Sequence, residues 1–112
     1  MVLEGMPCWK LVRDRVGEEL EKRRGDNLIV YRVKDQGVLE TFLRAKVVEE
    51  AIEFAVSGTL EEAVDVFEAL YGWLRVKGVG LDEVERVMRE KRRAKGGFEK
   101  GYIVVWLDRE TC

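Results

Sequence analysis

The sequence contains no histidine, one proline and only two cysteines among its 112 residues. The lack of histidine excludes His-based acid–base catalysis, His-containing zinc sites and di-iron sites built on Glu-x-x-His. Cys8 and Cys112 have no metal-ligand spacing. We expect them to be free thiols in a reducing cytosol, with a disulfide between them as the alternative. A metal site in this chain therefore has to use oxygen ligands.

Long apolar runs and a strong charge of one sign are also missing. No stretch approaches the roughly 18 apolar residues of a membrane helix, and residues 1–9 are too short and too acidic for a signal peptide. The net charge is −2, from 20 basic and 22 acidic residues, so no overall field attracts nucleic acid or anionic lipid. We expect a cytoplasmic protein that binds neither membrane nor nucleic acid.

The residues that are abundant indicate one globular domain over residues 1–112. Hydrophobic residues make up 46% of the chain and charged residues 38%, which is too apolar for a disordered protein. The combination of many Val, Glu, Lys and Arg with a single Pro and a single Asn is typical of a thermophile protein.

Hydrophobic periodicity and capping residues predict a mainly α fold. Thr59 is a favourable N-cap with Glu62 at the third position of a capping box, and Gly96 is a favourable C-cap. The β-branched segments 28–33 (LIVYRV) and 102–107 (YIVVWL) predict two strands, which we expect to pair because nothing else covers their edges. The prediction is a four-helix domain with a small two-stranded β-sheet, and its helices are expected at 13–24, 37–56, 59–77 and 81–95.

The two central helices are apolar over most of their circumference, and each confines its acidic residues to one narrow arc. A short turn at Ser57-Gly58 makes these helices antiparallel neighbours. Residues equally distant from the turn then lie side by side. Glu53 should meet Glu62, and Glu50 should meet Asp65, so that four carboxylates converge. Glu49, Glu61 and Glu68 lie on the same arcs, where a role at the site and a solvated helix face stay open.

Four carboxylates held together repel one another, by about 1 kcal/mol per pair at 4 Å in water and about 4 kcal/mol at an effective dielectric of 20. Protonation or salt bridges would relieve the repulsion, but a hard divalent cation is the most economical answer. An all-oxygen ligand set favours Mg²⁺, or Mn²⁺ in its place, over Zn²⁺. The competing interpretation is a solvated acidic face, which the mirrored pairs on largely apolar helices disfavour.

These motifs resemble a known family. Glu50-Ala-Ile-Glu53 followed by Glu62-Ala-Val-Asp65 is similar to the ExxE…ExxD signature of the MazG-like, all-α nucleoside triphosphate pyrophosphohydrolases. KLVRDRV at 10–16 and KGGFEK at 95–100 look like the end motifs of its phosphoribosyl-ATP pyrophosphohydrolase-like, house-cleaning branch. The resemblance spans residues 10–107. It departs from the branch at Gly17, where proline is usual, and in the short spacing of eight residues between Glu53 and Glu62.

The segment KVVEEAIEF at 46–54 also resembles the phosphoribosyl-ATP pyrophosphohydrolases of histidine biosynthesis. Those enzymes usually lack the amino-terminal segment and the carboxy-terminal strand expected here, so the house-cleaning branch is favoured. Either resemblance implies Mg²⁺-dependent cleavage between the α- and β-phosphates of a nucleotide, giving a monophosphate and pyrophosphate. It further implies that the catalytic metal ligands are Glu50, Glu53, Glu62 and Asp65.

Basic residues are the expected partners of the substrate phosphates. Lys91 and Lys95 continue the inward face of the 81–95 helix, although lysines in a last turn also complement the helix dipole. Lys46 lies on the acidic arc of the 37–56 helix, and Arg13 is a candidate through the KLVRDRV resemblance.

The apolar faces of the two central helices exceed what the rest of the chain can cover, which predicts a homodimer or a higher homo-oligomer. The alternative function is a non-catalytic helical dimerisation or adaptor module that keeps this fold.

Overall fold

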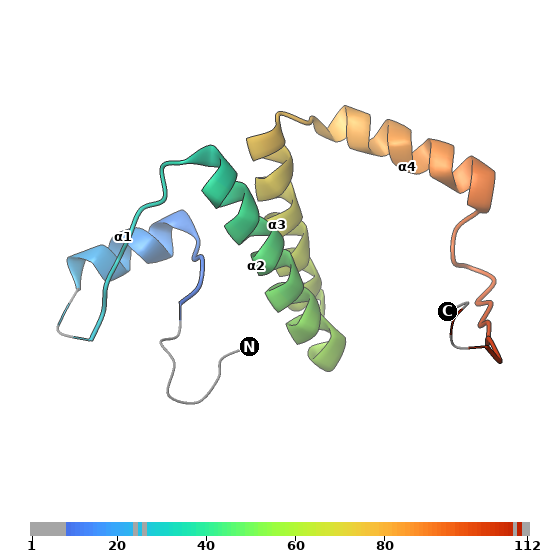
Figure 1. The fold of residues 1–112 in the computed structure, drawn as a ribbon, viewed down its shortest axis with the longest axis horizontal. Coiled ribbons are helices and arrows are strands. Elements are labelled where there is room, and N and C mark those ends of the chain that lie inside the picture. The colour runs from blue at the N-terminus through green and yellow to red at the C-terminus, as the bar shows by residue number, and fades with distance from the viewer. Residues whose placement is uncertain (1–8, 24, 26, 109, 111–112) are drawn as a thin grey trace. The chain divides into compact units, whose positions relative to one another are not determined.

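The computed structural model describes residues 9–23, 25, 27–108 and 110 (Figure 1). Cys8 and Cys112, the two expected free thiols, lie outside the described residues. The chain divides into two compact units, Met1–Val79 and Gly80–Cys112. In the part of the chain that the structure describes, no helix has the length and apolarity needed to span a membrane.

The mainly α prediction is confirmed, and the helix bounds lie close to the expected ones. The first unit contains α1 (Asp14–Lys22), α2 (Gln36–Ser57) and α3 (Leu60–Lys77), and the second contains α4 (Leu81–Lys95). The helix α4 has the bounds that the sequence predicts, whereas α1 is shorter at both ends.

Local hydrogen bonds explain where the central helices begin and end. The Asp35 side chain caps α2 by accepting a hydrogen bond from the backbone N–H of Val38 at 3.0 Å. Thr59 is the N-cap of α3 as predicted, and its Oγ1 accepts from the backbone N–H of Glu62 at 3.3 Å. Between the two helices, Gly58 ends α2 with a φ of 63°, a left-handed conformation that favours glycine. The sharp turn at Gly58 folds α3 back along α2.

Within the first unit, α2 and α3 pack side by side as an antiparallel hairpin (Figure 1). Gly72 allows a close approach, because a Cβ built on it would lie 3.0 Å from a methyl group of Leu43. One residue further along α3, the Trp73 indole N–H donates to Glu40 Oε1 at 3.1 Å. These contacts set the register in which Leu43 faces Gly72, and Leu43 and Ala69 are the buried apolar residues of the described chain.

Residues 9–13, which we call the strap, run along this hairpin before α1 begins. The Trp9 ring meets the Phe42 ring edge to face, with 5.1 Å between centroids. Lys10 Nζ lies 3.7 Å from Glu49 Oε1 on α2, and Arg13 Nη2 lies 2.7 Å from Asp65 Oδ1 on α3. The strap therefore contacts both helices of the hairpin.

The prediction of a two-stranded sheet is wrong. Residues 28–33 and 102–107 are all described, and neither segment forms a strand. Strand propensity reflects side chains packed on a half-buried sheet, and a two-stranded ribbon alone is only marginally stable in water. Both segments lack such packing, since Ile29 is 93% exposed and Ile103 is 87% exposed. Their β-branched residues favour the extended conformation locally, but the described residues offer no neighbouring surface on which a sheet could pack.

Candidate metal centre

The hairpin register places the acidic arcs of α2 and α3 opposite each other. Glu50 on α2 and Glu62 and Asp65 on α3 each offer a carboxylate oxygen, and these three oxygens lie within 4.8 Å of one another. No other such cluster occurs in the described part of the chain. Three of the four predicted carboxylates thus come together, and Glu53, the predicted neighbour of Glu62, is not among them.

Burial distinguishes this cluster from an ordinary acidic helix face. The Glu50 residue is buried, and Glu62 and Asp65 are half-buried. Glu50 Oε2 and Glu62 Oε2 are both shielded from solvent and have no hydrogen-bond partner among the described residues. A buried carboxylate oxygen without a partner is costly, and the described residues supply no partner for either of these two atoms.

The capping of α3 leaves the Glu62 carboxylate available. In a capping box, the glutamate side chain would accept from the backbone N–H of the N-cap residue. Here that N–H, on Thr59, donates instead to Ser57 Oγ at 3.3 Å. Glu62 therefore contributes its backbone N–H to the cap while its side chain joins the acidic cluster.

The electrostatic setting of Glu50 follows from its burial. Loss of solvent raises the pKa of the Glu50 carboxyl above its usual value, and the neighbouring Glu53 carboxylate adds to the rise. The hydrogen bond and positive charge of Lys46 oppose the rise without cancelling it. A further positive charge beside Glu50 would favour its ionised form.

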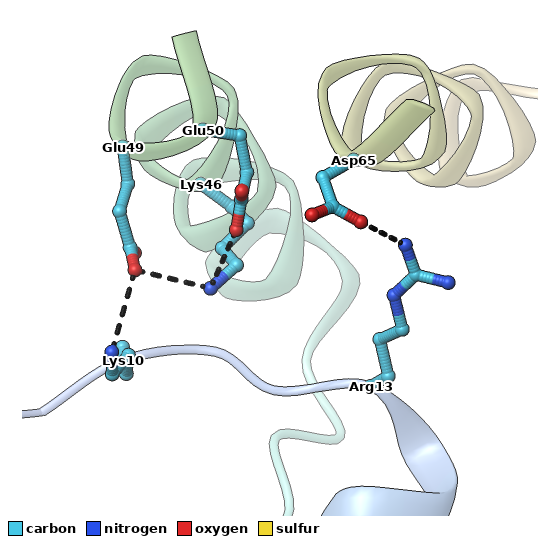
Figure 2. Close-up of polar contacts among 6 residues, drawn as sticks. All are labelled: Lys10, Arg13, Lys46, Glu49, Glu50 and Asp65. Atoms are coloured by element: carbon cyan, nitrogen blue, oxygen red, sulfur yellow. Dashed lines mark hydrogen bonds and ion pairs between the residues drawn. The ribbon is translucent and has the colours of Figure 1, made fainter. Parts of the chain in front are cut away.

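Two of the predicted phosphate-binding cations already lie at the cluster, as Figure 2 shows. Lys46 Nζ is 3.3 Å from Glu50 Oε1 and 3.2 Å from Glu49 Oε1. Arg13 reaches Asp65 from the strap. In this state the two cations partly neutralise the carboxylates, each from a different side.

The remaining predicted site residues lie elsewhere. Glu53 is exposed and is not one of the three converging carboxylates, although its charge acts on Glu50. Lys91 and Lys95 are exposed residues of α4 in the second unit, and their role at the site stays a prediction. Glu49 forms ion pairs with two lysines, Lys10 and Lys46. These ion pairs account for the acidic residue at this position of the arc.

The residues of the cluster fit a hard divalent cation. The donor set consists of carboxylate oxygens only, which suits Mg²⁺ or Mn²⁺. The two unpartnered oxygens on facing helices are the atoms that such an ion would satisfy. Glu50, Glu62 and Asp65 are therefore the residues that would hold it.

A cavity of about 520 Å³ continues from the cluster between the strap and the hairpin. The charged residues at this end of the lining are Arg13, Asp14, Lys46, Glu50, Asp65 and Glu68. Sequence reasoning missed its other walls, which combine apolar side chains with Tyr71 and Arg75.

Comparison of the chain with protein-family models, curated proteins and solved structures found no match. The family resemblance of the acidic motifs stays a prediction.

Proposed function

We propose that the protein is a Mg²⁺-dependent nucleotide pyrophosphohydrolase that cleaves the α–β phosphoanhydride of a nucleoside triphosphate or a phosphoribosyl-ATP-like substrate. The observation that carries the proposal is the meeting of Glu50, Glu62 and Asp65, with two buried carboxylate oxygens unpartnered among the described residues. The proposal also rests on the resemblance of the acidic motifs to the MazG-like family. Nucleotides are cytoplasmic metabolites, so the expected location is the cytoplasm.

The residues of the site have distinct roles in this proposal. Glu50, Glu62 and Asp65 would hold the metal, and Glu53, a neighbour of Glu50, is the fourth ligand that the family resemblance implies. Mg²⁺ supplies charge neutralisation for the phosphates and lowers the pKa of the attacking water. A carboxylate left free of metal takes the proton of that water.

In this proposal, Arg13 and Lys46 bind the substrate phosphates in addition to their carboxylate partners. Both are bound to carboxylates in the structure, Arg13 to Asp65 and Lys46 to Glu50. If a divalent cation took their place at those oxygens, the guanidinium and the ammonium would be available to bind substrate phosphates. Their long side chains need only rotate to do so.

The direct test is incubation of the protein with a panel of nucleoside triphosphates and Mg²⁺, followed by separation of the products. We expect a nucleoside monophosphate and intact pyrophosphate. Release of diphosphate and inorganic phosphate would contradict the proposed cleavage position. An absence of turnover across the panel, phosphoribosyl-ATP included, would contradict the enzymatic proposal and favour the adaptor alternative.

We also propose a homo-oligomer, with a dimer as the smallest form. Large apolar side chains on the hairpin are exposed, with Phe67 at 72% and Val48 at 59% exposure. Burying such side chains against a second copy is favourable by about 25 cal/mol per Å² of apolar surface. Light scattering at micromolar concentration should give at least twice the monomer mass of 13.0 kDa. A monomer would contradict this part of the proposal.

A further inference from the structure

We infer that the cavity beneath the strap is the subsite for the nucleoside part of the substrate, with the sugar and base lying along the hairpin away from the carboxylates. This inference rests on the proposed function and names the part of the substrate that the site recognises. The cavity volume of about 520 Å³ falls within the range of small-molecule pockets.

The register of the hairpin builds the cavity as a trough with two different ends. Along α2 the lining residues follow one another at helical spacing, and along α3 a second stripe mirrors them in the opposite direction. Glu50 faces Asp65 at one end, and Leu43 faces Gly72 further along. The stripes are Leu39, Leu43, Lys46 and Glu50 on α2, and Asp65, Ala69, Gly72 and Val76 on α3.

The chemistry of the trough changes along its length. Its first end carries the carboxylates that would hold the metal, with Arg13 and Lys46 beside them. Its other end is lined by the apolar side chains of Leu39, Leu43 and Val76 together with the polar Gln36 and Arg75. At a rise of 1.5 Å per residue, the eleven steps from Asp65 to Val76 span roughly 16 Å. A ligand that fits both ends is anionic at one end and apolar or aromatic at the other, as a nucleotide is.

An aromatic ring with a guanidinium over it lines the far part of the trough. The Arg75 guanidinium is 5.8 Å from the centroid of the Tyr71 ring, and both residues line the cavity. Tyrosine rings and arginine planes are the surfaces on which nucleobases stack. The strap closes the trough with Leu11 and Val12. A phosphate or a phosphosugar alone would leave these surfaces uncovered, so the base is the part of the ligand that they select.

The test compares ligands with and without a base on the full chain. Isothermal titration in Mg²⁺ measures binding of the common nucleoside 5′-monophosphates, ribose 5-phosphate and inorganic phosphate. At least one nucleoside monophosphate should bind about 10-fold tighter than ribose 5-phosphate, since stacking a base on an aromatic side chain is worth about one factor of ten.

Two variants locate the binding site, and a third is their control. Val76→Phe fills the far end of the trough and Tyr71→Leu removes the aromatic ring, so each should weaken binding of the preferred nucleoside monophosphate about 10-fold. Neither should change the affinity for Mn²⁺ or inorganic phosphate, which depends on the other end. Val56→Phe makes the same substitution on α2 at a position that is 86% exposed and does not line the cavity, so it should behave as wild type. If Val76→Phe does not fold, as judged by circular dichroism, Tyr71→Leu decides the test.

The outcomes separate this inference from the proposed function. A wild-type protein that releases pyrophosphate, but whose nucleotide affinity Val76→Phe and Tyr71→Leu leave unchanged, overturns the nucleoside subsite and leaves the proposed function standing. Equal affinity for ribose 5-phosphate and every nucleoside monophosphate overturns it as well. A wild-type protein that neither binds Mn²⁺ nor releases pyrophosphate overturns both.

Discussion

The acidic residues of α4 and those of the α2–α3 hairpin have similar sequence patterns but different surroundings. On α4 the carboxylates of Glu83, Glu85 and Glu90 are 56–75% exposed. Each lies within 4.0 Å of an arginine one turn away on the same helix. On the hairpin, the Glu50 side chain is only 11% exposed, and one of its oxygens has no partner within the described chain.

The comparison shows what a solvated acidic face looks like in this molecule. On α4, each of the three carboxylates is exposed to solvent and lies near an arginine three or four residues away. Keeping these side chains ionised therefore costs little free energy. On the hairpin, two helices bring carboxylates together and shield them from water, so repulsion and desolvation add up. The solvated-face interpretation accounts for α4 and fails for Glu50 and Glu62.

The largest difference between the two regions should appear in turnover, when one carboxylate is neutralised in each of them. Asp65→Asn keeps the side-chain shape but removes a charge from the proposed metal site. We expect turnover to fall at least about 100-fold, because changes even outside the ligand shell of a metal often cost 10- to 100-fold. Asp82→Asn on α4 is the matched control and should leave steady-state pyrophosphate release unchanged. A fully active Asp65→Asn enzyme would mean that the two regions do not differ in function.

Metal should stabilise the protein through the hairpin alone. At about 100 times its dissociation constant, a ligand that binds only the folded state adds roughly 2.7 kcal/mol to the free energy of unfolding. For a domain of this size, that shift corresponds to several degrees in Tm. Thermal melts with Mg²⁺, Mn²⁺ and EDTA measure it. Identical midpoints in millimolar metal and in EDTA would show that no carboxylate of the molecule holds a cation.

The raised pKa of Glu50 predicts how metal-free stability depends on pH. Because burial raises the pKa in the folded state above the ordinary value of 4.5, the folded protein holds this proton more tightly than the unfolded chain. The resulting stabilisation is complete below that ordinary value and is lost as pH rises through the folded pKa. Glu50→Gln escapes this loss, so in EDTA it should be more stable than wild type at pH 7.

Denaturant unfolding of wild type and Glu50→Gln at several pH values tests this prediction. The stability advantage of Glu50→Gln should shrink as the pH falls through the raised pKa of the folded state, where the wild-type carboxyl takes up its proton, and should be smallest at and below 4.5. Glu90→Gln, which changes an exposed residue of α4, should show no such pH-dependent advantage. A Glu50→Gln protein that is less stable than wild type at pH 7 would mean that the Lys46 ion pair outweighs desolvation.

The smallest effect on stability is expected from breaking exposed ion pairs, a type of contact that occurs in each of the two regions. Arg13 and Asp65 have side chains that are 57% and 40% exposed, so breaking their pair with Arg13→Gln should cost at most about 1 kcal/mol. Arg86→Gln on α4 should cost a similar amount. Mn²⁺ affinity should stay the same or rise in Arg13→Gln, because a competing cation has left Asp65. A fall in Mn²⁺ affinity would instead give Arg13 a supporting role at the metal.

The parts of the fold that depend on local sequence could be predicted. Thr59 caps α3 through its own side chain, and the short turn at Gly58 makes the helices antiparallel, so the meeting of Glu50 with Asp65 followed from counting residues. The segments 28–33 and 102–107 failed because strand formation requires neighbours that a local pattern cannot reveal.

The surroundings of the site were less predictable than its carboxylates. The Arg13–Asp65 pair joins residues that are 52 positions apart, and no periodicity connects the strap to α3. The burial of Glu50 depends on how α2 and α3 pack against each other, which the pattern of one helix alone does not reveal. Nothing in the sequence pattern distinguishes Tyr71 and Arg75 from other residues of α3, and only the structure shows that both line the cavity.

The most direct test of the central claim is a Mn²⁺ titration of wild type, Glu62→Gln and Glu90→Gln by calorimetry. Glu62 is the cleanest probe because its carboxylate has no ion pair with any described residue and carries one of the unpartnered oxygens. We predict that wild type and Glu90→Gln bind Mn²⁺ with equal affinity, and that Glu62→Gln binds it at least about 10-fold more weakly. Equal affinity in all three proteins, or no binding to wild type, would contradict a metal site on the hairpin.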